Sequence, residues 1–206
     1  MYRKDINFYY IFLEGSKDIK TYHNLYPKIL SYSARAEAYK KALIGKKDKK
    51  RIKGFTENPQ QTIDDMYDWV LYYKPHHHTP ITINDGITKK KRKILVPCFQ
   101  ELCIQHLIVK QLEPMFYQGM YEHSYASIPN RGAHKGKKQI EKWIKYDPKN
   151  CKYVFKGDIH HFFPSINHDI LKAKLAKKIK DEQFLDLVYK VIDTTKTGLP
   201  IGFYKD

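Results

Sequence analysis

The stretch KYVFKGDIHHFFPSIN, residues 152–167, predicts a short buried strand that ends near a carboxylate. The apolar run YVF comes first, Asp158 follows it, and Phe162 and Phe163 precede a Pro-Ser turn. An acidic residue in this position often only begins a turn. A carboxylate at the end of a strand is also what Mg²⁺ needs, because this ion binds hard oxygen ligands together with substrate phosphates.

The charge of the chain favours a polyanionic partner. The 206 residues contain 38 Lys and Arg against 22 Asp and Glu, a formal net charge of +16. Basic runs occur at residues 46–53, 89–93 and 134–138. Nucleic acid is the first candidate partner, and a membrane surface is the weaker one because no basic run has a clear apolar face.

Two further classes are disfavoured by composition. No run of 18 apolar residues occurs, so no membrane span is predicted. The three cysteines are odd in number and lack CxxC spacing. They fit reduced thiols in the cytoplasm better than a disulfide framework or a zinc site.

The pattern of helix and strand signals predicts an α+β fold. Asp85 and Gly86, between two β-rich runs, indicate a hairpin, and residues 153–159 indicate a strand. Apolar periodicity and capping residues predict helices over residues 32–43, 58–74, 97–116, 135–146, 167–179 and 182–192. The order lacks the regular alternation of a doubly wound sheet.

The stretch around Asp158 resembles the first palm motif of reverse transcriptases, most closely that of the bacterial and phage lineages. Three other segments resemble further motifs of the family in the same order: residues 89–116, 123–144 and GLPIG at 198–202. Together the motifs cover roughly residues 60–203.

The resemblance implies a right-hand polymerase with fingers and an incomplete palm. Residues 1–80 would form an N-terminal helical extension and part of the fingers, residues 81–150 the fingers, and residues 151–206 the first half of the palm. We expect truncation before the second palm motif and the thumb, because the family's aromatic-x-Asp-Asp motif is missing. The pair Asp64 and Asp65 lies in a predicted helix on the wrong side of Asp158.

The resemblance also implies roles for individual residues. Asp158 would be the catalytic carboxylate, and it would bind Mg²⁺ together with the backbone carbonyl of Ile159. Phe163 would be the aromatic gate that rejects the ribose 2′-OH, while Phe162 is expected in the core. The residues expected at the nucleotide are Lys90, Arg92, Arg131, Phe163, Leu199, Pro200, Ile201 and Gly202.

The implied function is RNA-directed DNA polymerisation, a nucleotidyl transfer typical of retroelements and phage. The expected partners are an RNA template, an RNA–DNA hybrid and dNTP, and this piece is expected to be inactive alone. Two alternatives stay open: a non-catalytic nucleic-acid-binding module, and a phage-defence polymerase that makes untemplated DNA. Ile128 stands where many intron-type members have Arg, which argues against a group II intron protein.

The triplet His76, His77 and His78 is the remaining metal candidate. Between two prolines and without other nearby ligands, it is expected to be a solvated loop.

Overall fold

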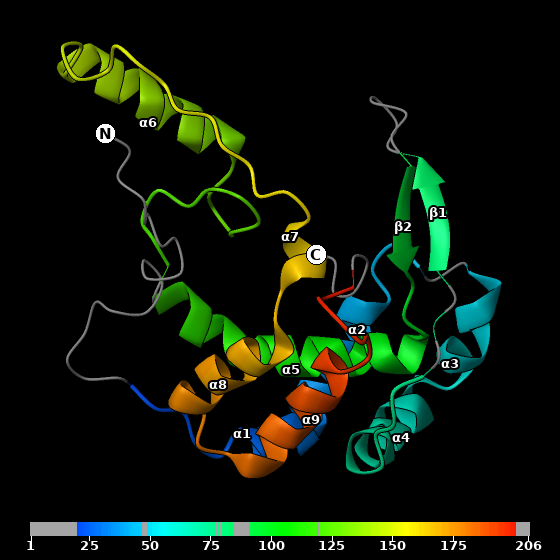
Figure 1. Cartoon of the computed structure of the whole chain (residues 1–206). Helices are drawn as coiled ribbons and strands as arrows, with labels where there is room; N and C mark the ends of the chain where they lie inside the picture. The colour runs from blue at the N-terminus through cyan, green and yellow to red at the C-terminus, as the bar shows by residue number, and fades with distance from the viewer. Residues whose placement is uncertain are drawn as a thin grey trace. The chain divides into compact units, whose positions relative to one another are not determined.

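The computed structural model describes residues 20–46, 49–76, 78, 80–84, 91–118 and 120–200 (Figure 1). The chain divides into two compact units. One comprises Met1–Lys17, Met115–His160 and Asp206, and the other comprises Asp18–Pro114 and His161–Lys205. The three-part division into extension, fingers and palm stays a prediction.

The larger unit is mainly helical and carries one two-stranded sheet. It contains α1 (Leu25–Leu30), α2 (Tyr32–Ala42), η1 (Lys50–Ile52), α3 (Lys53–Glu57), α4 (Pro59–Leu71), β1 (Pro80–Asn84), β2 (Lys91–Leu95), most of α5 (Phe99–Gln118), α7 (Phe162–Ser165), α8 (His168–Lys178) and α9 (Glu182–Ile192). The smaller unit contains α6 (Ala133–Tyr146) and the end of α5. The mixed helical and strand content agrees with the α+β prediction. No helix in the described part of the chain is both long and apolar enough to cross a bilayer.

Capping side chains explain why several helices begin where the sequence predicts. Ser31 accepts a hydrogen bond from the backbone N–H of Ala34 at the start of α2, and Asn167 accepts one from Ile170 at the start of α8. Asn58 caps α4 in the same way. Each side chain satisfies a backbone donor that has no partner inside its helix.

Within the larger unit, one carboxylate joins two segments that are far apart in the sequence. Asp181 caps α9 by accepting from Phe184 N–H at 3.0 Å, and its second oxygen accepts from the N–H groups of Leu25 and Tyr26 at 2.6 and 2.8 Å. Tyr22 and Ile179 form a parallel β-bridge beside this contact. One carboxylate therefore serves the first turns of both α1 and α9.

The core of the larger unit is assembled from the apolar faces of these helices. Its fully buried side chains include Ile29, Met66, Ile104, Leu107 and Phe184. The buried Arg35 extends this packing, because Nη1 donates to the backbone carbonyls of Ile63 and Asp64 and so joins α2 to α4.

The predicted hairpin is present, but its register differs from the expected two-residue turn. β1 and β2 are antiparallel, and Asn84 pairs with Lys91. A turn made only of Asp85 and Gly86 would instead pair Asn84 with Ile87. The connection, residues 85–90, lies outside the described residues.

Two other expectations are wrong. The helix expected over residues 97–116, with Pro97 and Pro114 as its bounds, passes through Pro114 and ends at Gln118, and its apolar face extends to the buried Met115. Residues 153–159 form no strand, and the side chains of Tyr153, Val154 and Phe155 are about nine-tenths exposed, at 93%, 89% and 91%. A strand needs a neighbour to complete its backbone hydrogen bonds, and no described residue pairs with this segment.

Candidate nucleotide pocket

Two of the predicted nucleotide-binding segments are in direct contact within the larger unit. The N–H of Leu199 donates to the carbonyl of Phe163 at 2.9 Å. Gly198 makes this approach possible: its φ is +66°, and a β-carbon there would lie 2.4 Å from the Phe163 oxygen and 2.5 Å from Cα of Pro164. Only glycine fits both the left-handed backbone and the available space.

A polar network holds the loop that carries Leu199. The carbonyl of Gly198 accepts from Thr195 Oγ1 at 2.7 Å and lies 2.6 Å from Nε2 of His168. Nδ1 of the same ring lies 3.2 Å from the Asp193 carboxylate, which also pairs with Lys172. The ring of His168 therefore lies between the loop carbonyl and the Asp193 carboxylate and joins the two.

The positively charged neighbours of Asp193 lower the pKa of its carboxyl group. The hydrogen bond from Lys172 is the main reason that the pKa of Asp193 lies below its usual value, and His168 adds to the effect. Asp193 therefore stays ionised, and it anchors His168 against the loop.

Phe162 and Phe163 do not divide into one core residue and one pocket residue as predicted. Their exposed fractions are 48% and 46%, so the expectation that Phe162 is core is wrong. Both lie in α7, a helix of four residues that follows His161 in a left-handed conformation. So short a helix, with no buried residue, leaves both rings half exposed.

The predicted metal ligands belong to the smaller unit. Asp158 is exposed, and Ile159 is 57% exposed. Among the described residues, Asp158 forms no hydrogen bond or ion pair. Among these residues, no cationic side chain therefore competes with a metal ion for the carboxylate oxygens of Asp158. These oxygens are hard donors of the kind that Mg²⁺ prefers.

Arg131, also in the smaller unit, organises its own loop. Its Nη1 donates to the backbone carbonyls of Tyr121, Glu122 and Ser124 at 3.2, 2.9 and 3.1 Å. A guanidinium has five N–H donors, so Nη1 is committed to the loop and the rest of the group is the part that could meet a phosphate.

The remaining predicted residues lie on the hairpin and beyond α9. Arg92 is exposed on β2, where it pairs in register with Ile83. Pro200 is half-buried beside Leu199. Lys90, Ile201 and Gly202 lie outside the described residues.

A cluster at the start of α5 was not predicted. His78 is almost fully buried and pairs with the buried Glu101, so a solvated histidine loop is the wrong expectation for this residue. His76 and Cys98 lie beside the same carboxylate. Burial raises the pKa of the Cys98 thiol and that of the nearby Tyr73 hydroxyl. The signal in the sequence was Glu101, an acidic residue inside an otherwise apolar helical run.

Sequence comparisons relate this chain to proteins encoded in introns, although no family model matches it. It is 26% identical over 140 residues to the group II intron-encoded protein LtrA of Lactococcus lactis, covering 68% of this chain and 22% of that protein. It is 29% identical over 109 residues to an uncharacterised 91 kDa protein in the cob intron of Schizosaccharomyces pombe, covering 53% and 13%. Protein YkfC of Escherichia coli is 23% identical over 122 residues, covering 56% and 30%.

The chain therefore spans less than a third of the length of each of these relatives. LtrA is a group II intron-encoded protein, so the matches include the type of protein that Ile128 argued against.

Proposed function

We propose that this chain provides the fingers and the first catalytic carboxylate of an RNA-directed DNA polymerase of the reverse transcriptase class. The observation that carries the proposal is the contact between Phe163 and Leu199. These residues come from two separate motifs that the family resemblance assigns to one nucleotide pocket. The similarity to intron-encoded proteins supports the same class of protein.

In this proposal each segment has a distinct task at the incoming dNTP. The half-exposed ring of Phe163 would lie under the sugar and exclude a 2′-OH. The backbone of residues 199–202 would line the pocket. Lys90 and Arg92 would hold the triphosphate, for which the forked donors of Arg are well suited.

Asp158 and the carbonyl of Ile159 would hold Mg²⁺. When bound, magnesium stabilises the attacking and leaving oxygens of nucleotidyl transfer. The role of this chain's own residues is to orient the triphosphate and keep the sugar in place. A two-metal site needs further carboxylates, and the 206 residues contain no aromatic-x-Asp-Asp motif.

The test compares nucleotide selectivity in two adjacent variants. With RNA–DNA hybrid and Mg²⁺ present, the chain should bind dNTP in preference to the matching rNTP. A pocket that excludes one hydroxyl by shape reaches a preference of about 100-fold at most. Phe163→Ala should bring this preference close to unity, because it removes the ring under the sugar. Equilibrium binding of fluorescent dNTP and rNTP analogues measures both.

Phe162→Ala is the matched control, since its ring has nearly the same exposure and belongs to the same short helix. It should leave the preference unchanged. If the two variants behave alike, Phe163 is not the gate.

The formal charge of +16 also supports one other candidate, a non-catalytic nucleic-acid-binding module. That function predicts binding of hybrid without any selective binding of dNTP. A polymerase of untemplated DNA predicts dNTP binding that does not depend on the hybrid.

A further inference from the structure

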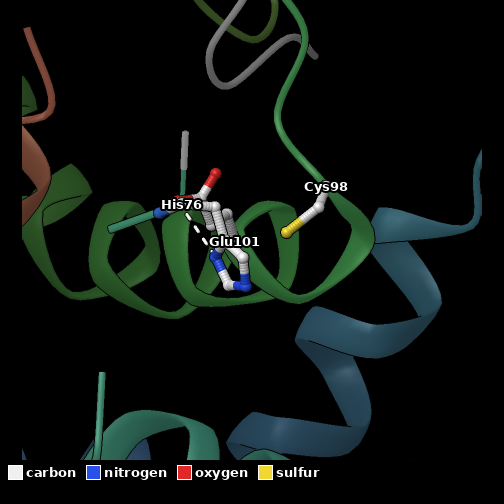
Figure 2. A group of neighbouring side chains, drawn as sticks. All are labelled: His76, Cys98 and Glu101. Carbon is white, nitrogen blue, oxygen red and sulfur yellow. Dashed lines mark hydrogen bonds and ion pairs between the residues drawn. The ribbon is translucent and has the colours of Figure 1, made fainter. Parts of the chain in front are cut away.

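Three potential metal ligands converge where the hairpin joins the helical part of the larger unit. Figure 2 shows the side chains of His76, Cys98 and Glu101 turned toward one another. One ligand atom from each residue lies within 4.8 Å of the other two. Glu101 lies in the first turn of α5, Cys98 directly precedes this helix, and His76 comes from the segment after α4.

Glu101 is the centre of the cluster. Its side chain is 1% exposed, and one oxygen lies 3.4 Å from Nδ1 of His76 and accepts from the His76 N–H at 2.8 Å. Nε2 of the buried His78 contacts the other oxygen. Within the described residues, both ion-pair partners of this buried carboxylate are histidines. A buried carboxylate without a permanent cation nearby is costly, and a divalent ion would supply the missing charge.

The chemistry of the donors selects the metal. A thiolate, an imidazole and a carboxylate match the ligands of Zn²⁺, whereas Mg²⁺ prefers oxygen donors only. Three protein ligands leave a fourth position for water or another ligand. Nε2 of His78 lies in ion-pair contact with the second oxygen of Glu101, and an outer contact of this kind can orient a metal-binding carboxylate.

We propose that His76, Cys98 and Glu101 bind a zinc ion, with His78 as the residue that positions Glu101. His76 and Glu101 are separated by 25 positions in the chain, so the site lacks the short CxxC spacing by which zinc sites are recognised in sequence. The site is separate from the proposed magnesium ligands and does not depend on the polymerase assignment.

A zinc ion bound at this cluster would also restrain the hairpin formed by β1 and β2. Pro80 of β1 pairs with Leu95 of β2 at the open end of the hairpin, and the two ligand segments continue from these ends of the strands. In Figure 1 the hairpin projects from the helices near the start of α5. A bound ion would tie both strand ends to α5 and so restrain the hairpin that carries Arg92.

The first experiment measures zinc directly. The whole chain is stripped with a chelator, dialysed, and titrated with Zn²⁺ against a chromophoric competitor. We expect one tight site per chain. Cys98→Ser and His76→Ala should each weaken it by more than about 100-fold, and His78→Ala by about 10- to 100-fold, the usual range for an outer-shell partner.

The second experiment identifies the thiolate. Co²⁺ in the site should give a near-ultraviolet thiolate-to-metal charge-transfer band. Cys98→Ser should abolish the band, while the matched Cys151→Ser should retain it, because Cys151 is a free, half-buried thiol in the other unit. His160→Ala with His161→Ala controls for binding by other histidines.

The results decide the proposal in either direction. Absence of a tight zinc site, or a charge-transfer band that survives Cys98→Ser, overturns it and leaves the cluster as a histidine–carboxylate network. His76 is half exposed, so His76→Ala should fold even if a change at the buried Glu101 does not. Circular dichroism of each variant verifies folding.

Discussion

At the scale of single residues, Gly198 determines whether the loop after α9 can meet α7. Its backbone is left-handed, and the space beside its Cα is filled by the carbonyl of Phe163 and by Pro164. The resemblance to a polymerase motif identified GLPIG as important. The resemblance did not indicate why the first glycine of the motif is required. The reason is that its backbone packs against the segment that carries Phe163.

Gly198→Ala should therefore destabilise the protein and separate Leu199 from Phe163. A left-handed non-glycine residue costs about 1–3 kcal/mol, and the overlap with backbone atoms adds to that cost. Urea denaturation measures the loss in the free energy of unfolding. Gly54→Ala is the control: Gly54 lies in α3 with nothing near its missing β-carbon, so alanine should stabilise by about 0.5–1 kcal/mol. Equal effects at the two glycines would contradict the contact described here.

The site could be predicted only in part because its residues depend on different kinds of information. Local motif order was enough to select Phe163 and Leu199, which do touch. The His76–Cys98–Glu101 cluster depends on packing between the segment after α4 and the start of α5. Sequence spacing carries no signal for such a meeting.

At the scale of secondary-structure elements, helices with local signals were predicted well. Ser31, Asn58 and Asn167 cap the helices that follow them, and each cap is visible in the sequence. Elements that depend on distant partners were not. Residues 153–159 have the apolar composition of a strand, but composition does not provide a neighbouring strand. Helix α1 was missed for a related reason, since its capping carboxylate comes from Asp181.

Asp181→Ala should cost more than the loss of an ordinary helix cap. The substitution leaves the first turns of both α1 and α9 without their acceptor. At about 0.5–2 kcal/mol for each cap, we expect a loss of about 1–4 kcal/mol. Asn167→Ala removes a single cap, that of α8, and should cost about 1 kcal/mol. If urea denaturation shows that Asp181→Ala lowers the free energy of unfolding no more than Asn167→Ala does, the hydrogen bonds from Leu25 and Tyr26 do not contribute to stability.

At the scale of the whole molecule, the formal charge of +16 dominates the expected behaviour. Much of it lies on exposed helical surfaces, including Lys135, Lys137 and Lys138 on α6. In the proposed polymerase these lysines would face the template backbone. Charge at this density attracts phosphate without reading base sequence.

Binding to RNA–DNA hybrid should accordingly weaken steeply with salt. If about five phosphates are contacted, the plot of log affinity against log salt should have a slope near −4, at roughly −0.7 to −0.9 per phosphate. Replacing Lys135 and Lys138 of α6 with alanine should make the slope shallower by about 1–2. Lys137 is left in place because it pairs with Glu141. Filter binding across a salt series measures both slopes.

The control for this series uses lysines that already have acidic partners. Lys41 pairs with Glu37 and Lys190 pairs with Asp186, so their replacement should change the slope little. A slope near zero for the unmodified chain would remove the nucleic-acid assignment altogether.

The double role of Asp181 also has a consequence for how the protein is made. Its bonds to the start of α1 span 155 and 156 positions of the chain. At about 5–20 residues per second of synthesis, α1 waits roughly 8–30 s before its capping residue leaves the ribosome. Throughout that interval α1, too short to be stable in isolation, has its apolar side available to chaperones.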